Sequence, residues 1–181
     1  MSPSEIAAIG GASVLAFWIL GAHNRLVRLR QAIAASFAKV DLQLRQRHAL
    51  LAELTAAAEA ELKDAPEAIA AVDAARRQAR IAADHAAHRP ASAGRMASLV
   101  LAEQVLRTAL SRLITLVKAR PSLKSDPRLR EVMKELSTTQ HRLAAATDTF
   151  NAAVLDYNRS IRQFPTRLIA ATFGFHVAGK L

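Results

Sequence analysis

The most regular pattern in the chain is an apolar stripe near its C-terminal end, where apolar residues recur at alternating steps of three and four. This spacing is typical of one face of an α-helix, and a mean period of about 3.5 residues favours side-by-side packing with a left-handed supercoil. A helix this continuous leaves no internal loop on which an active site could be built. The stripe comprises Leu129, Val132, Leu136, Thr139, Leu143, Ala146, Phe150, Val154, Tyr157, Ile161 and Phe164, and Pro165 ends it.

Two further stripes of the same kind precede it, and they predict an all-α fold. One comprises Leu26, Leu29, Ile33, Phe37, Val40, Leu44, Leu51, Leu54, Ala58 and Leu62, interrupted by Arg47, and the other Met96, Leu99, Val100, Leu106, Leu110, Leu113, Ile114 and Val117. Breaks are predicted near Asp64 and Pro66, where Asp64 can cap a new helix, over residues 89–94, before Pro121 and at Asp126. We therefore expect a long antiparallel bundle of about four helices. Its alanine-rich segment, residues 67–88, should be held least strongly, because alanine buries little apolar area.

The N-terminal segment from Ile6 to Ala22 carries no charge, and it is followed by three arginines. Seventeen residues reach the lower length limit for a membrane-spanning helix. A cleaved signal peptide needs a basic start, whereas this chain starts MSPSE. We predict a retained anchor over residues 6–24, after a short extracytoplasmic segment (1–5) and before a bundle domain (25–165) and an apolar tail (166–181). The alternative is a buried helix of a soluble bundle.

The membrane-flanking arginines predict an orientation. Arg25, Arg28 and Arg30 lie on one side of the anchor, and basic residues next to a membrane span favour the cytoplasmic side. We therefore expect a single-pass protein whose first helix runs on from the anchor, with the N-terminus outside and the bundle in the cytoplasm.

The net charge of +10 suggests an anionic partner. The surplus is largest over residues 66–125, where Arg76, Arg77 and Arg80 share a helical surface. This surface could contact anionic lipid headgroups or nucleic-acid phosphates. Specific nucleic-acid binding is not expected, because no recognised motif or aromatic stacking residue accompanies the arginines. The plain alternative is a solvated basic surface.

Few residues suggest catalytic or metal chemistry. The chain has no cysteine, which excludes disulfides, thiolate metal sites and cysteine nucleophiles. His85 and His88 share a helical face, but two ligands do not make a metal site. No nucleophile motif or glycine-rich phosphate loop is present. We predict no catalytic residue, no metal and no cofactor.

The C-terminal sequence closely resembles the signature of the LemA family of bacterial proteins. The resemblance rests on residues 158–175 (NRSIRQFPTRLIAATFGF), on Phe150 to Tyr157, on Ala102-Glu103 and Pro121 to Lys124, and on Asn24 to Val27 and Val40 to Arg47. It departs from the family pattern at Arg120, where an aromatic residue is usual, and at Gln140 and Thr147, where charged residues are usual. It implies a membrane-anchored bundle in the bacterial inner membrane, with no established enzymatic chemistry and no cofactor.

The family-motif residues Tyr157, Asn158, Phe164, Pro165, Phe173, Gly174 and Phe175 are therefore expected to serve structure or interaction. The apolar tail either folds back over the bundle, which we favour, or acts as a hydrophobic hook for a partner or the membrane. The expected function is a membrane-anchored scaffold or interaction protein without catalytic activity. Its partners would be the lipid bilayer and either another protein or a second copy bound through helical surfaces. The alternatives are a basic bundle that binds anionic lipid or nucleic acid and, remotely, a cryptic membrane-associated hydrolase.

Overall fold

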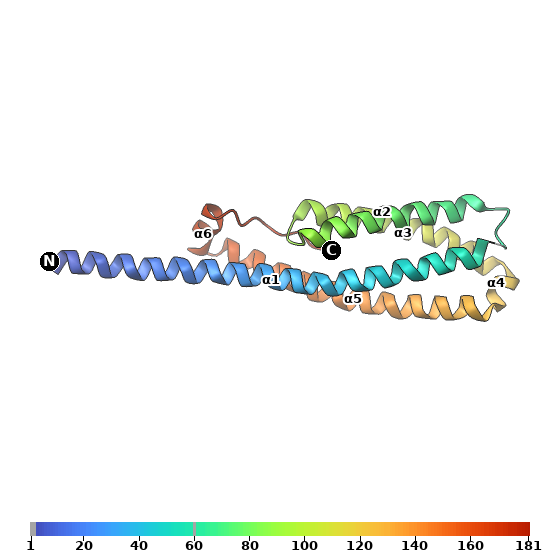
Figure 1. Ribbon diagram of the computed structural model, residues 1–181, viewed down its shortest axis with the longest axis horizontal. Helices are drawn as coiled ribbons and strands as arrows, with labels where there is room; N and C mark the ends of the chain where they lie inside the picture. Colours follow the sequence, from blue (N-terminus) through green and yellow to red (C-terminus); the bar gives the residue numbers. More distant parts are fainter. Residues whose placement is uncertain (1–2, 60) are drawn as a thin grey trace.

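The computed structural model describes residues 3–59 and 61–181, and every regular element in that part of the chain is a helix (Figure 1). The helices are α1 (Pro3–Glu59), α2 (Pro66–His88), α3 (Ala93–Ala119), α4 (Pro121–Ser125), α5 (Pro127–Arg162) and α6 (Thr166–Thr172). The predicted all-α class and the helical bundle are confirmed.

Helix α1 is a single rod of 57 residues. At 1.5 Å per residue it is roughly 85 Å long, and its N-terminal part projects beyond the other helices (Figure 1). The apolar N-terminal segment and the first bundle helix are therefore one element, as the uninterrupted pattern predicted. The other three long helices lie alongside the rest of α1.

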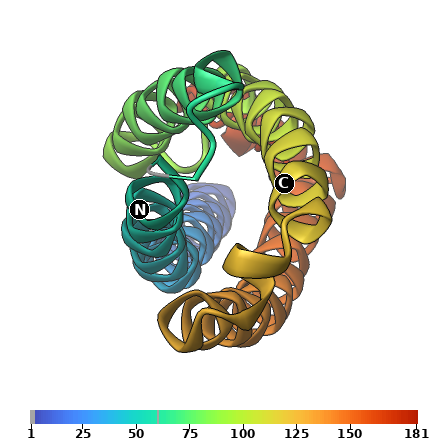
Figure 2. The same ribbon diagram turned by 90° about the vertical axis from the view of Figure 1, so that its right-hand side faces the viewer.

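The four long helices run antiparallel to their neighbours, with α1 packed against both α5 and α2, and α2 packed in turn against α3 (Figures 1 and 2). Their apolar faces form two cores. The proximal core, nearer the projecting part of α1, includes Leu26, Ile33, Phe37, Phe150, Val154 and Tyr157. The distal core includes Leu51, Leu54, Val72, Leu106 and Leu113. Phe37 and Phe150 meet edge to face in the proximal core, with ring centroids 5.5 Å apart.

The three apolar stripes face these cores, with two exceptions at their edges. Helix α5 ends at Arg162, so Phe164 lies beyond the helix and is 75% exposed, and the predicted extension of the stripe to Phe164 is wrong. Val100 is 41% exposed at the margin of α3. In α2 the buried face consists of Val72 and alanines, while the larger Ile81 is exposed. The alanine-rich helix thus approaches α1 and α3 closely but buries little side-chain volume.

The other helix ends follow the predicted breaks, except for the role of Asp64. Asp126 caps α5 by accepting a hydrogen bond from the backbone N–H of Arg128 at 2.8 Å, and Pro127 opens the first turn. Pro66 likewise opens α2, but the residue preceding it is Ala65, and Asp64 makes no capping hydrogen bond. The prediction that Asp64 caps α2 is therefore wrong.

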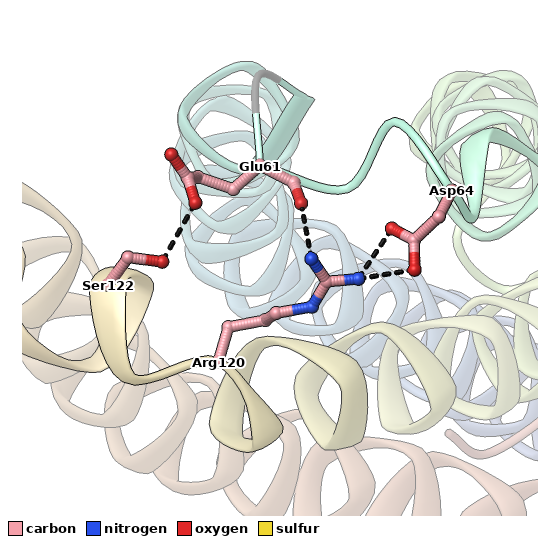
Figure 3. A network of polar contacts seen from close by, with 4 residues as sticks. All are labelled: Glu61, Asp64, Arg120 and Ser122. Carbon is pink, nitrogen blue, oxygen red and sulfur yellow. Dashed lines mark hydrogen bonds and ion pairs between the residues drawn. The ribbon is translucent and has the colours of Figure 1, made fainter.

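Asp64 instead belongs to a polar network that closes the distal end of the bundle (Figure 3). Its carboxylate pairs with the guanidinium of Arg120, which also donates to the backbone carbonyl of Glu61 at 2.9 Å. Ser122 donates from its hydroxyl to the Glu61 carboxylate at 2.8 Å. The hydrogen bond from Arg120 lowers the pKa of Asp64. Arg120, one of the departures from the family pattern, thus ties the α1–α2 loop to the junction of α3 and α4.

Candidate functional site: a buried ion layer beneath a groove

A layer of polar side chains separates the two apolar cores. Arg47 and His48 enter it from α1, and Glu103 from α3, each with a side chain no more than 14% exposed. Arg47 Nη1 lies 2.6 Å from Glu103 Oε2, and His48 Nε2 lies 3.2 Å from Glu103 Oε1. Thr139, from α5, is also buried, and its hydroxyl has no partner among the described residues.

The Glu103 carboxylate is held in its charged form by this layer. Burial alone would raise the pKa of Glu103, but the hydrogen bond from His48 and the positive charge of Arg47 outweigh it and the pKa is lowered. Both carboxylate oxygens are occupied, one by each neighbour. The arrangement therefore fixes the relative register of α1 and α3 rather than presenting a free base to a substrate.

A groove of about 300 Å³ opens above this layer, between α3 and α5. Arg47 and Glu103 form part of its floor, and exposed polar residues of both helices form its rims. Arg107 contributes a positive charge on the α3 rim and Asp148 a negative charge on the α5 rim. The remaining lining includes Val40, Leu44, Leu99, Val100, Gln140, Leu143, Ala144, Thr147 and Leu181. Such a groove can receive a small polar or zwitterionic group, but it contains no arrangement of nucleophile and base within the described residues.

We predict that Glu103→Gln weakens the bundle in a pH-dependent way. The substitution leaves Arg47 buried without its counter-charge, so the free energy of unfolding at pH 7 should fall by about 2 kcal/mol. Because the folded-state pKa of Glu103 lies below its ordinary value of 4.5, the wild-type advantage is present above that value and is lost as the pH falls through the lower, folded-state pKa. Urea unfolding of the two proteins across acid and neutral pH measures this.

Glu131→Gln is the matched control. Glu131 makes a surface pair with Lys134, and its side chain is 70% exposed. Exposed pairs of this kind contribute little, so this variant should stay within about 0.5 kcal/mol of wild type at every pH. Equal effects of the two substitutions would contradict the buried ion layer.

The three arginines of the predicted basic surface on α2 differ in exposure and pairing. Arg76 is about one quarter exposed and pairs with Asp73 at 3.3 Å. Arg77 and Arg80 are exposed and make no ion pair with a described residue. The three arginines lie on one helix, but only two offer an uncompensated charge.

The family-motif residues fall into an inward and an outward group. Tyr157 donates a hydrogen bond to the backbone carbonyl of His176 at 3.0 Å, and its burial raises its pKa. The Asn158 amide bonds both the N–H and the C=O of Ala178, at 2.8 and 2.9 Å. Gly174 supplies the positive φ of 69° at the turn, and Phe175 is buried beyond it. Phe164 and Phe173 are exposed, on either side of α6.

The tail therefore folds back along the bundle, as favoured from the sequence. Asn151 repeats the Asn158 arrangement one heptad earlier, bonding the N–H and C=O of Leu181 at 3.0 and 2.9 Å. Each asparagine pairs with the tail as a neighbouring strand would, which satisfies the extended backbone. Gly179 lies against α3, where a Cβ would stand 2.8 Å from the Ala93 Cα.

Sequence reasoning missed the ion layer and the role of Asn151. The signal for the layer was Arg47, a charge inside an apolar stripe, whose partner on another helix could not be identified from spacing. The signal for Asn151 was its separation of seven residues from Asn158. His85 and His88 are both exposed, and no three potential metal ligands meet within the described ranges.

The sequence model of the LemA family matches residues 36–180, which contain the ion layer, Asn151 and Asn158, and all of the groove's lining except Leu181. The chain belongs to the LemA family. No match was found among curated proteins. In this LemA-family protein the matched region begins within α1, so the projecting apolar segment precedes it. That segment is long and apolar enough to span a membrane, and none of its 18-residue window is buried by the rest of the chain.

Proposed function

We propose that this LemA-family protein is a membrane-anchored helical scaffold without catalytic activity. The observation that carries the proposal is the apolar window of α1, none of which is buried by the rest of the described chain. A buried helix of a soluble bundle would be covered by other helices, whereas Val14 is 70% exposed and Phe17 78%. Large apolar side chains in such a row are stable in lipid and unfavourable in water. Retention of the protein in alkaline-washed membranes tests the anchor directly.

The proposed cellular location is the bacterial inner membrane, with the bundle on the cytoplasmic side. Arg25, Arg28 and Arg30 follow the apolar segment and are exposed, while Glu5 precedes it. The positive-inside rule then leaves the short N-terminal segment outside. Because α1 is one continuous helix, the bundle would begin directly at the membrane surface, with no flexible linker between them.

The partner surface that we infer is the outer face of α2 and α3. A shallow groove of about 840 Å³ runs between these helices, with Ile81, Leu101 and Val105 each more than half exposed along it. Small residues, Ala71, Ala74 and Ser98, leave room between the larger ones. This is the shape that accepts the apolar stripe of a helix, so the proposed occupant is an amphipathic helix of another protein.

A photo-crosslinking residue placed at Leu101 tests this surface in native membranes. We expect an adduct with another protein that disappears when Ile81 is replaced by Glu, because a charge in the groove opposes an apolar helix. The same crosslinker at Leu42, which is 62% exposed on α1, is the control. An adduct of twice the chain mass would show a second copy in the groove and contradict the assignment to another protein. Equal crosslinking at both positions would contradict the groove itself.

The basic surface of α2, formed by Arg76, Arg77 and Arg80, is a weaker candidate for a binding surface than the groove between α2 and α3. Arg76 is paired with Asp73, and Asp84, one turn beyond Arg80, is paired with Arg45 of α1. Acidic groups are thus interleaved with the arginines, which reduces the field that anionic lipid or nucleic acid would meet.

A further inference from the structure

The end of the bundle nearest the projecting part of α1 carries large apolar side chains that are more than half exposed. Phe164 is 75% exposed, Leu168 55% and Phe173 52%. All three belong to the corner formed by α6 and the residues on either side of it, while Ile169 and Ala170 of the same helix are buried, Ala170 within the proximal core. The corner is therefore anchored to the bundle by one face and exposes an apolar surface with the other.

This corner lies at a defined height along α1. The ring of His23 stands 4.8 Å from that of Phe173 and 5.6 Å from that of Phe175. His23 directly follows the uncharged segment that ends at Ala22. Figure 1 shows α6 beside α1 at the place where α1 leaves the bundle. A bilayer spanned by the uncharged segment would have its surface at the level of α6.

The charges around the corner suit a lipid surface. Residues 22–38 and 157–181 contain seven Lys or Arg and no Asp or Glu. Arg162 begins the corner and Arg167 lies in its helix α6; both are exposed and form no ion pair with any described residue. Exposed aromatic and leucine side chains among arginines are the composition of segments that lie in the interfacial zone of anionic membranes.

We propose that this corner, residues 162–175, is a membrane foot: a second contact with the bilayer in which Phe164, Leu168 and Phe173 enter the interfacial zone and Arg162 and Arg167 bind anionic headgroups. The inference rests on the proposed anchor, since the anchor sets the height of the membrane. Two contacts on different elements would fix the tilt of the bundle, because a single helix leaves it free to lean. The foot also explains why a tail clamped by Asn151 and Asn158 has exposed aromatic residues next to buried ones.

The absence of cysteine allows a direct test. The full-length protein is reconstituted in vesicles of phosphatidylcholine and phosphatidylglycerol with one environment-sensitive fluorophore, attached to Leu168→Cys, Val14→Cys or Leu42→Cys. Leu42 is the matched control, because it is a leucine of similar exposure about 28 Å further along α1 than His23. Lipids carrying a nitroxide quencher in the upper acyl chain, for positions 168 and 42, or near the end of the acyl chain, for position 14, then report contact with the bilayer.

We expect the probe at 168 to lose about half or more of its emission, as expected for a group buried 5–10 Å into the headgroup boundary, and the probe at 42 to lose little. Replacing both Arg162 and Arg167 by Gln should weaken quenching at 168 and leave quenching at 14 unchanged. Circular dichroism of each labelled protein confirms that the bundle is folded.

The outcomes separate the foot from the anchor. Quenching at 14 without quenching at 168 would overturn the foot and leave the anchor in place. Loss of quenching at both positions would overturn the anchor, and the foot with it. A probe at 168 that is shielded from water but not quenched by lipid would show that protein covers the corner, which also overturns the proposal.

Discussion

Replacing Val14 and Phe17 together by Arg should release the protein from the membrane. Both side chains lie in the uncharged segment from Ile6 to Ala22, Val14 at its midpoint, and both are exposed. A charged residue near the centre of a spanning helix costs about 2.5–3.5 kcal/mol for insertion, so two of them remove the advantage of a segment that is already of minimal length. We expect the wild-type protein in alkaline-washed membranes and the double variant in the supernatant. Because both side chains are largely exposed rather than packed in either core, the unfolding midpoint of the bundle should be unchanged.

The control for this result places the same charges on the bundle. Leu42 and Leu101 are 62% and 64% exposed, so Leu42→Arg with Leu101→Arg adds equal charge without touching the anchor. This variant should remain in the membrane fraction. Release of the control, or retention of the anchor variant, would contradict a lipid-spanning α1.

A reporter fused after Leu181 tests the orientation in the same cells. With Arg25, Arg28 and Arg30 on the cytoplasmic side, a fluorescent protein should be active there and alkaline phosphatase should be inactive. Active phosphatase would reverse the orientation, although the anchor itself would stand. It would also place the membrane foot and the groove between α2 and α3 on the opposite side of the membrane.

The helical architecture was predictable because periodicity is a local property. The stripes from Leu26 to Leu62 and from Leu129 to Ile161 required only that apolar residues gather on one face, and the structure buries these faces. The end of α5 was less predictable, since Phe164 continues the spacing although the helix stops at Arg162. The role of Asp64 also depends on the three-dimensional arrangement. Its position before Pro66 predicts a helix cap, but its carboxylate pairs with Arg120, which follows the C-terminal end of α3. Competition between a local cap and a distant cation cannot be resolved without the three-dimensional arrangement.

The candidate site was predictable only in fragments. The resemblance singled out Tyr157, Asn158, Gly174 and Phe175. The hydrogen bonds by which Tyr157 and Asn158 hold the tail join residues about twenty positions apart in the sequence, so local spacing does not reveal them. Arg47 was visible as an interruption, whereas Glu103 had no local feature to distinguish it from any surface glutamate. Buried ion pairs join helices whose relative register the sequence does not state. For the same reason, the sequence does not show that the exposed side chains of the foot lie level with the end of the uncharged segment, which the contact between Phe173 and His23 establishes.

The largest loss of stability should follow Phe150→Ala. Phe150 is fully buried in the proximal core and packs edge to face on Phe37. Removing its ring leaves a cavity between α1 and α5, the most extensively packed helix pair, and large-to-small substitutions of buried Phe cost about 3–5 kcal/mol. Chemical denaturation of the full-length protein in mild detergent, followed by far-ultraviolet circular dichroism, should show a reduction of about 4 kcal/mol. A change of less than about 1 kcal/mol would contradict the packing of α5 on α1.

Phe164→Ala provides the comparison within the same sequence pattern. Phe150 and Phe164 are two heptads apart and both fit the apolar stripe, yet one is fully buried and the other 75% exposed. In detergent, truncation of the exposed ring should change the free energy of unfolding by no more than about 0.5 kcal/mol. The contrast would separate burial from periodicity, because the pattern alone predicts equal losses. A large loss at Phe164 would mean that this ring packs on the bundle in solution, and it would then be unavailable to the membrane foot.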